Sequence, residues 1–189
     1  MKCRIDKSQC KVFLKFGKMP IANGFLRKKD FKKEYFFDLN IAFNKKLALF
    51  QLEKNPDPKK MFNKNYPFYT SSSKFMASHF KDFANWIKKK FKHKKKIKIM
   101  EIGSNDGTFL ENFKTNFHIG IEPSKSVHNV ALKNKINSKN IFFNNLLTKN
   151  LKKKKIKFDV IMGSNVICHI PDQNNLIKNI KNILDDDGM

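Results

Sequence analysis

The sequence predicts an α/β fold: a small β-rich module followed by a Rossmann-like parallel sheet. Three observations predict it. From residue 75 onward, apolar runs of strand length alternate with segments of helical periodicity. One of those runs ends in an acid and a glycine turn, and the next run ends in another acid. Residues 1–54 instead carry short apolar runs divided by turn residues, which is typical of strands.

The β-rich module contains apolar runs at Lys11–Phe16 and Tyr35–Leu52. The turn residues between them are Gly17, Pro20, Asn23 and Gly24. Residues 55–74 follow as a connector rich in proline, asparagine and serine, which we expect to fold over a ligand. Ser72 or Ser73 is placed to cap the next helix.

Residues 75–189 carry the alternating elements. The first is an amphipathic helix with an apolar face of Phe75, Phe80, Phe83, Ile87 and Phe91. We then expect, in order, a strand at 97–102, a helix from about 107, a strand at 118–121, a helix at 126–134, a short strand at 141–143, a strand at 158–163 and a helix at 174–184. The lysine runs at 88–96 and 152–155 are expected at solvated loops or helix ends.

The formal net charge of +24 suggests a polyanionic partner. Only Arg4 and Arg27 supply the guanidinium group that reads base edges, so a solvated lysine surface is favoured and a nucleic-acid partner is disfavoured. Three cysteines are too few for a disulfide framework and are expected to be free thiols. The sequence shows neither a signal peptide nor a membrane-spanning run, so a cytoplasmic location is expected. It carries no signal for oligomeric state.

The segment most informative about function is KIKIMEIGSNDGTFLENF, a strand that runs through Glu101 into a glycine turn. Gly103 and Gly107 let the backbone approach a ligand closely, and Asp106 or Thr108 can cap a following helix. Asn105 lies in the same turn. These residues predict a nucleoside-binding turn.

Glu122 ends the next strand, where its carboxylate can hold both hydroxyls of a ribose. A carboxylate at Asp106 repels a pyrophosphate, whereas Glu101 and Asp106 suit the positive sulfonium and ammonium of S-adenosylmethionine. The charge pattern therefore favours this methyl donor. The alternative is that the glycines only make a tight turn and that Glu122 caps the helix near Ser124.

With those residues in view, the chain resembles the class I S-adenosylmethionine-dependent methyltransferases that methylate sugar-nucleotide carbons. The matching segments, in order, are KFGKMPIANGFL, YFFDLNIAFNKKLALFQL, NYPFYTSSS, EIGSNDGTFLENF, GIEPS and SNVICHIPD. The resemblance implies S-adenosylmethionine as cofactor, a nucleotide-sugar substrate, and methyl transfer to a sugar carbon beside a keto group.

The resemblance also implies a zinc site of four thiolates from two CxxC pairs in the N-terminal module. The corresponding positions here are Cys3 and Asp6 in one pair and Asn44 and Leu47 in the other, with Cys10 out of register. We therefore expect no zinc, and a degenerate module held by apolar packing of Phe37, Ile41, Phe43 and Leu49. Cys3 is then expected to be a surface thiol.

The family continues beyond the position at which this sequence stops, so the resemblance predicts an N-terminal fragment of the full enzyme. A second hypothesis is a non-catalytic module that binds the cofactor or a partner. A third, an RNA-binding or RNA-methylating protein, is disfavoured because SNVICHIPD lacks the Asn-Pro-Pro-Tyr type of motif.

His169, Tyr66 and Tyr69 are candidates for acid–base work or substrate positioning, each against a structural alternative. Asn165 either contacts the amino-acid part of the cofactor or caps a strand. Phe142, Phe143 and Asn144 lie where adenine contacts are common, although core packing is equally expected, and Cys168 is expected in the core.

Overall fold

The computed structural model describes residues 1–189, which form two compact units. The first comprises Met1–Phe62 together with Pro171–Asn174. The second comprises Asn63–Ile170 together with Asn175–Met189. None of the helices combines the length and the apolar character that crossing a bilayer requires.

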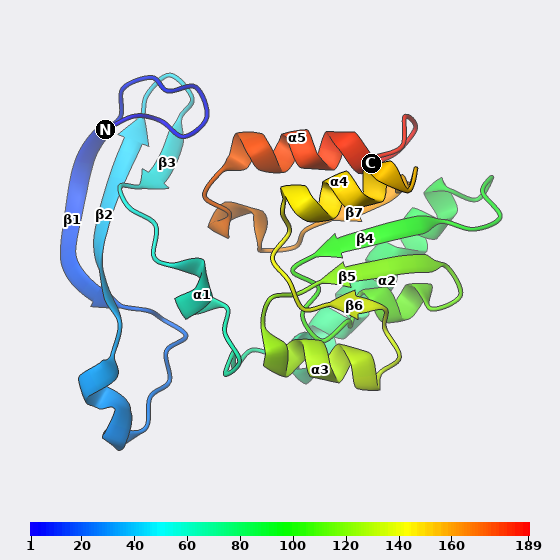
Figure 1. Ribbon diagram of the computed structural model, residues 1–189, viewed down its shortest axis with the longest axis horizontal. Coiled ribbons are helices and arrows are strands. Elements are labelled where there is room, and N and C mark those ends of the chain that lie inside the picture. The colour runs from blue at the N-terminus through cyan, green and yellow to red at the C-terminus, as the bar shows by residue number, and fades with distance from the viewer. The chain divides into compact units, whose positions relative to one another are not determined.

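The first unit is built on a three-stranded antiparallel sheet in the order β1-β2-β3 (Figure 1). Its strands are β1 (Lys11–Pro20), β2 (Phe36–Asn44) and β3 (Leu49–Leu52). The pairing of β1 with β2 shifts register between Lys15 and Lys18, where Gly17 has a φ of +76°. Two short helices, η1 (Lys28–Lys33) and α1 (Pro58–Met61), complete the unit, and the predicted β-rich module is confirmed.

The buried core of this unit differs from the predicted one. It consists of Cys3, Cys10 and Ala42, against which Met1, Val12 and Leu49 pack. Of the predicted core residues Phe37, Ile41, Phe43 and Leu49, only Leu49 packs on this core, and all four are half-buried. The expectation of a surface thiol at Cys3 was wrong, because that side chain is fully buried. All three cysteines are free thiols, as predicted.

The second unit contains a four-stranded parallel sheet in the order β6-β5-β4-β7 (Figure 1). The strands are β4 (Lys98–Ile102), β5 (Phe117–Ile121), β6 (Ser138–Lys139) and β7 (Val160–Met162). The predicted parallel α/β arrangement is confirmed. The expected strand at 141–143 was wrong, because the edge strand is Ser138–Lys139, which pairs with Gly120 and Ile121.

Helices cover both faces of the parallel sheet (Figure 1). One core joins α2 (Lys74–Lys90) and α3 (Lys125–Lys133) to the sheet, and the other joins α4 (Asn145–Lys153) and α5 (Gln173–Ile183) to it. The sequence did not predict α4. Ser73 begins α2 as predicted, because its Oγ accepts a hydrogen bond of 3.2 Å from the Met76 N–H.

The helix expected from Gly107 is absent. A turn follows this glycine instead, and then a single 3₁₀ helix, η3 (Leu110–Phe113). Asp106 fixes the turn, because its Oδ1 accepts hydrogen bonds from the Thr108 N–H (3.3 Å) and hydroxyl (2.6 Å). The acid thus stabilises a local turn and does not cap an α-helix.

Candidate functional site

The turn after β4 is shaped by two glycines in the left-handed region. Gly103 has a φ of +72°, and a Cβ there would lie 2.8 Å from Val166 Cγ2. Gly107 has a φ of +83°, and a Cβ there would lie 2.7 Å from Ile136 Cγ1. Only glycine combines these backbone angles with such close neighbours. The main chain is therefore packed tightly on the inside of the turn.

Glu122 holds this turn from the end of β5. Its Oε2 accepts a hydrogen bond of 2.9 Å from the Asn105 N–H, and its Oε1 accepts one of 2.6 Å from the Ser124 N–H. The Ser124 N–H lies immediately before α3, so Glu122 also makes the contact at the helix start that its alternative, capping role would require. Each carboxylate oxygen can accept a further hydrogen bond, so a diol remains compatible with both contacts.

The connector before α2 is fastened to the glycine turn. Asn105 Oδ1 accepts a hydrogen bond of 3.0 Å from the Thr70 N–H, and Asn105 Nδ2 donates one of 2.9 Å to the Phe68 carbonyl. Asp106 Oδ2 accepts a hydrogen bond of 2.9 Å from the Ser71 N–H. Thr70 and Ser71 lie in the 3₁₀ helix η2 (Thr70–Ser72). The side chains of Asn105 and Asp106 therefore position the connector.

Three buried carboxylates lie around the turn, with exposed fractions of 4% for Glu101, 1% for Asp106 and 5% for Glu122. None of them forms an ion pair with a basic side chain. Burial, followed by the charges of Glu122 and Asp106, raises the pKa of Glu101 well above its ordinary value. Burial also raises the pKa of Glu122, against hydrogen bonds from Ser124 and Asn105 that lower it.

Several buried polar atoms at this edge of the sheet have no hydrogen-bond partner: Glu101 Oε2, Ser104 Oγ and Ser124 Oγ. Buried polar atoms in proteins nearly always have partners, so a cluster of exceptions marks a place where a ligand can supply them. Glu101 Oε2 is an unpaired acceptor in an acidic environment. A ligand with cationic and hydroxyl groups therefore fits these residues. The sequence had assigned no role to Ser104 and had named Ser124 only in the alternative helix-capping role of Glu122, although both lie inside the two motifs.

Tyr66 lies in the part of the connector next to Glu122. Burial, followed by the charge of Glu122, raises the pKa of the Tyr66 hydroxyl. The Ser126 hydroxyl donates a hydrogen bond of 3.0 Å to the Tyr66 carbonyl. Tyr69 is half-buried and precedes η2, and its carbonyl accepts a hydrogen bond of 2.7 Å from the Ser72 hydroxyl. Tyr66 is thus the tyrosine that the electrostatics connect to the acidic turn.

The loop after β7 contributes a different set of residues. Asn165 is exposed and has a φ of +52°. Val166, next in sequence, is the residue that packs against Gly103. His169 ends the 3₁₀ helix η4 (Ile167–His169) and is exposed. The expectation that Cys168 lies in the core was wrong, because this loop leaves it exposed.

The residues after β6 contribute mainly to helix capping and core packing. Asn144 caps α4, where its Oδ1 accepts a hydrogen bond of 2.9 Å from the Leu147 N–H. Phe143 packs against the core beneath α4 and α5. Phe142 is 36% exposed and is the aromatic side chain of this segment that faces solvent.

Two known families match parts of this chain. The family described as "Methyltransferase domain" matches residues 73–189, which is more than half of the chain. The chain belongs to this methyltransferase family. A second family, described as "Putative zinc binding domain", matches residues 3–62. The chain carries an S-adenosylmethionine-dependent methyltransferase domain preceded by a small antiparallel module.

Several solved structures resemble part of this chain at low sequence identity. The plantazolicin methyltransferase BpumL, in complex with a desmethyl analogue and S-adenosylhomocysteine, is 20% identical with a TM-score of 0.48, over 61% of this chain and 45% of that chain. The magnesium protoporphyrin IX methyltransferase ChlM of Synechocystis PCC 6803 with bound SAM is 11% identical with a TM-score of 0.44, over 58% and 54%. DesVI of Streptomyces venezuelae is 16% identical with a TM-score of 0.43, over 59% and 48%.

This chain therefore spans about half the length of the solved structures it matches. No curated protein matches it.

Proposed function

We propose that the second unit binds S-adenosylmethionine at the edge of the sheet formed by the glycine turn and Glu122. The observation that supports this most directly is the group of three buried acids, Glu101, Asp106 and Glu122, which form no ion pair in a chain of net charge +24. A buried carboxylate without a cation is costly, and a ligand bearing a sulfonium and an ammonium lowers that cost.

The individual residues have distinct proposed roles. Gly103 and Gly107 let the main chain lie against the nucleoside, and Glu122 accepts hydrogen bonds from the ribose hydroxyls. Glu101 supplies negative charge through its unpartnered oxygen. Asn105 and Asp106 hold the connector in place, and Asn165 offers an exposed amide for the amino-acid part of the cofactor.

The activity that we propose is methylation of a carbon beside the keto group of a nucleotide-linked sugar. Bound S-adenosylmethionine supplies an electrophilic methyl group. The substrate must lose a proton from the carbon that is methylated, which requires a base and a group that stabilises the enolate. His169 is a candidate for the base that removes this proton, and Tyr66 and Tyr69 are candidates for orienting the sugar. The resemblance of the sequence motifs supports this substrate class.

The cofactor proposal is tested by calorimetry with S-adenosylhomocysteine on the full chain. Glu122→Gln keeps an acceptor for the Ser124 N–H but removes the charge, and it is expected to weaken binding roughly 10- to 100-fold. The matched control is Glu111→Gln, because Glu111 is an exposed acid of η3 that pairs with Lys114. The control is expected to bind as the unchanged protein does. Equal affinity of all three proteins would refute the proposed site.

The substrate proposal has a separate test, in which the chain is incubated with labelled methyl donor and either a nucleotide-linked keto sugar or an RNA pool. The proposed reaction is supported if the unchanged protein labels the sugar carbon and the His169→Ala variant does not. Label on RNA alone contradicts it.

A further inference from the structure

The first unit contains two turns at the positions where the family resemblance places a metal site. One runs from Cys3 to Lys7 and the other from Asn44 to Ala48. In each turn the fifth residue lies in the left-handed region, with a φ of 61° at Lys7 and 50° at Ala48. Such angles are uncommon for residues other than glycine, so the two turns share one unusual backbone feature at equal spacing.

The side chains on these two turns do not fit zinc. A structural zinc ion needs about four ligands, usually thiolates or imidazoles. Leu47 offers no ligand atom, and the Asp6 carboxylate is already paired with the Lys46 ammonium at 2.9 Å. Asn44 directs its Nδ2, a hydrogen-bond donor, toward Cys10 Sγ at 3.6 Å. No group of three or more histidine, cysteine, aspartate or glutamate side chains in the chain is arranged to hold a metal.

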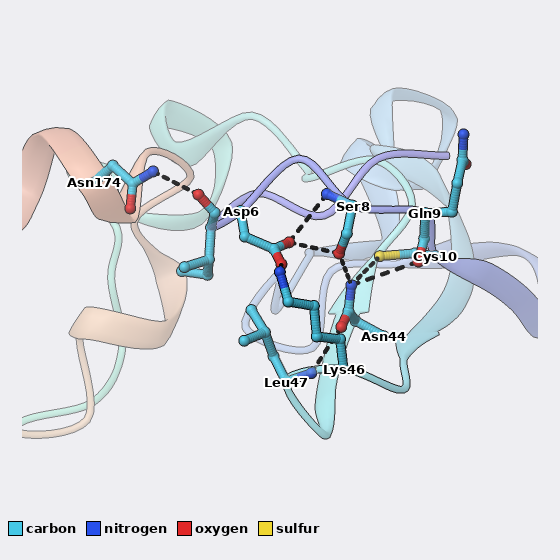
Figure 2. Close-up of polar contacts among 9 residues, drawn as sticks. Asp6, Ser8, Gln9, Cys10, Asn44, Lys46, Leu47 and Asn174 are labelled. Atoms are coloured by element: carbon cyan, nitrogen blue, oxygen red, sulfur yellow. Dashed lines mark hydrogen bonds and ion pairs between the residues drawn. The ribbon is translucent and has the colours of Figure 1, made fainter.

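A continuous polar network joins the two turns at the positions of the absent zinc ligands (Figure 2). Asn44 Nδ2 donates to the Ser8 hydroxyl oxygen at 2.6 Å and to the Gln9 carbonyl at 3.5 Å. The Ser8 hydroxyl donates to Asp6 Oδ1 at 2.6 Å, and Asp6 pairs with Lys46. The network therefore runs from the first turn to the second along two routes.

Asn44 is the residue on which this network converges. Its Oδ1 accepts a hydrogen bond of 2.8 Å from the Leu47 N–H and thereby closes the second turn, while its Nδ2 reaches the segment after the first turn. The side chain is fully buried, at the end of β2. Loss of this amide would remove the bond that closes the second turn and would leave the Ser8 hydroxyl with Asp6 as its side-chain partner.

We propose that the N-terminal module is a metal-free form of a zinc-binding fold, in which Asn44 and the Asp6–Lys46 pair join the two turns in place of the ion. The module keeps the backbone of the metal site and has exchanged its ligands for internal hydrogen bonds. Its folding is accordingly independent of zinc.

The thiols provide a probe specific to this module. Cys3 and Cys10 are buried in it, whereas Cys168 is exposed in the other unit. Thiol labelling followed by peptide mass spectrometry reports how often the module opens, since the buried thiols react only when it does. We expect purified protein to contain no stoichiometric zinc and a zinc chelator to leave the labelling rates of both buried thiols unchanged.

Asn44→Ala is expected to raise those labelling rates roughly 30- to 100-fold, from the loss of the hydrogen bonds that this buried amide makes to both turns. Asn40→Ala is the matched control, because Asn40 lies on the same strand and its side chain donates a hydrogen bond to Glu53, away from the two turns. We expect a change of less than about 5-fold there. Equal rates in the two variants, or zinc whose removal exposes the thiols, would overturn the proposal.

Restoring the ligands tests the backbone part of the proposal. The triple substitution Asp6→Cys, Asn44→Cys and Leu47→Cys adds three thiols to Cys3. This variant is expected to bind one zinc or cobalt ion per chain, with the absorption of tetrahedral cobalt thiolate, and to become sensitive to chelators. A folded variant that takes up neither metal would contradict the claim that the two turns keep metal-site geometry.

Discussion

Replacing Gly107 by alanine should destabilise the methyltransferase domain through two separable effects. The φ of +83° lies in the left-handed region, which costs a residue with a Cβ about 1–2 kcal/mol. The new methyl group would also lie 2.7 Å from Ile136 Cγ1 and 3.2 Å from Ile136 Cβ. Ile136 is buried in the core beneath α2 and α3, so relieving this overlap costs about 1–3 kcal/mol more.

The expected loss is therefore about 2–5 kcal/mol, a large part of the roughly 5–15 kcal/mol that stabilises a typical domain. Urea unfolding followed by tryptophan fluorescence measures it, because the only tryptophan, Trp86, lies in α2 of the same unit and stacks on Phe83.

A double-mutant cycle with Ile136→Ala separates the two effects. Removing the γ-carbons of Ile136 makes room for the new methyl group, so the double variant should be more stable than the sum of the single losses by about 1–3 kcal/mol. Strictly additive losses would show that Ile136 does not oppose a side chain at position 107, and the proposed cause would then be wrong.

Three further outcomes are expected. Asn105→Gly removes the side-chain bonds to Phe68 and Thr70, and glycine tolerates the φ of +49° at this position. Calorimetry should show S-adenosylhomocysteine binding weakened roughly 10-fold, and limited digestion should show faster proteolysis of residues 66–72. Because the pKa of Glu101 is raised in the folded domain, its contribution to stability is lost as the pH rises above the ordinary value of 4.5. Glu101→Gln should therefore raise the Tm of the ligand-free domain at pH 8, and the increase should be smaller at pH 5. Hydrogen bonds from Ser8 and the Lys46 ammonium lower the pKa of Asp6. The contribution of Asp6 to stability is therefore present above its ordinary pKa of 3.8 and is lost in stronger acid. Amide exchange of β1–β3 should accordingly be faster in Asp6→Asn than in the unchanged protein near neutral pH, and the two should converge in strong acid.

Much of the parallel sheet could be predicted from the sequence, because β4 and β5 are runs buried on both faces and each leads into a charged or glycine residue. The prediction missed α4. This helix buries only Leu147, Thr148 and Leu151, a narrow stripe, and its last turn carries Lys152 and Lys153. Lysines at that end favour the helix through its dipole, yet in the sequence they merge with a run of charge that suggests a loop.

The edge strand was misplaced for a different reason. Ile141–Phe143 has the greater strand propensity, but Gly120 and Ile121 of β5 pair with Ser138 and Lys139. Main-chain pairing and the cap at Asn144 decide the position, and neither depends on side-chain hydrophobicity. The bonds from Asn105 and Asp106 to the connector were equally invisible, since they join side chains to main-chain groups 35 residues away.

The polar groups around Asn44 and those at the glycine turn differ in how they are paired, and this contrast bears on function. In the first unit, Asn44 and the residues around it satisfy one another, and Lys46 neutralises Asp6. In the second, Glu101 keeps an oxygen without a partner beside two further carboxylates. A chain with 40 lysine and arginine residues has no shortage of cations with which to pair them. The unpaired acids at the glycine turn therefore fit the positively charged ligand that we propose for this site.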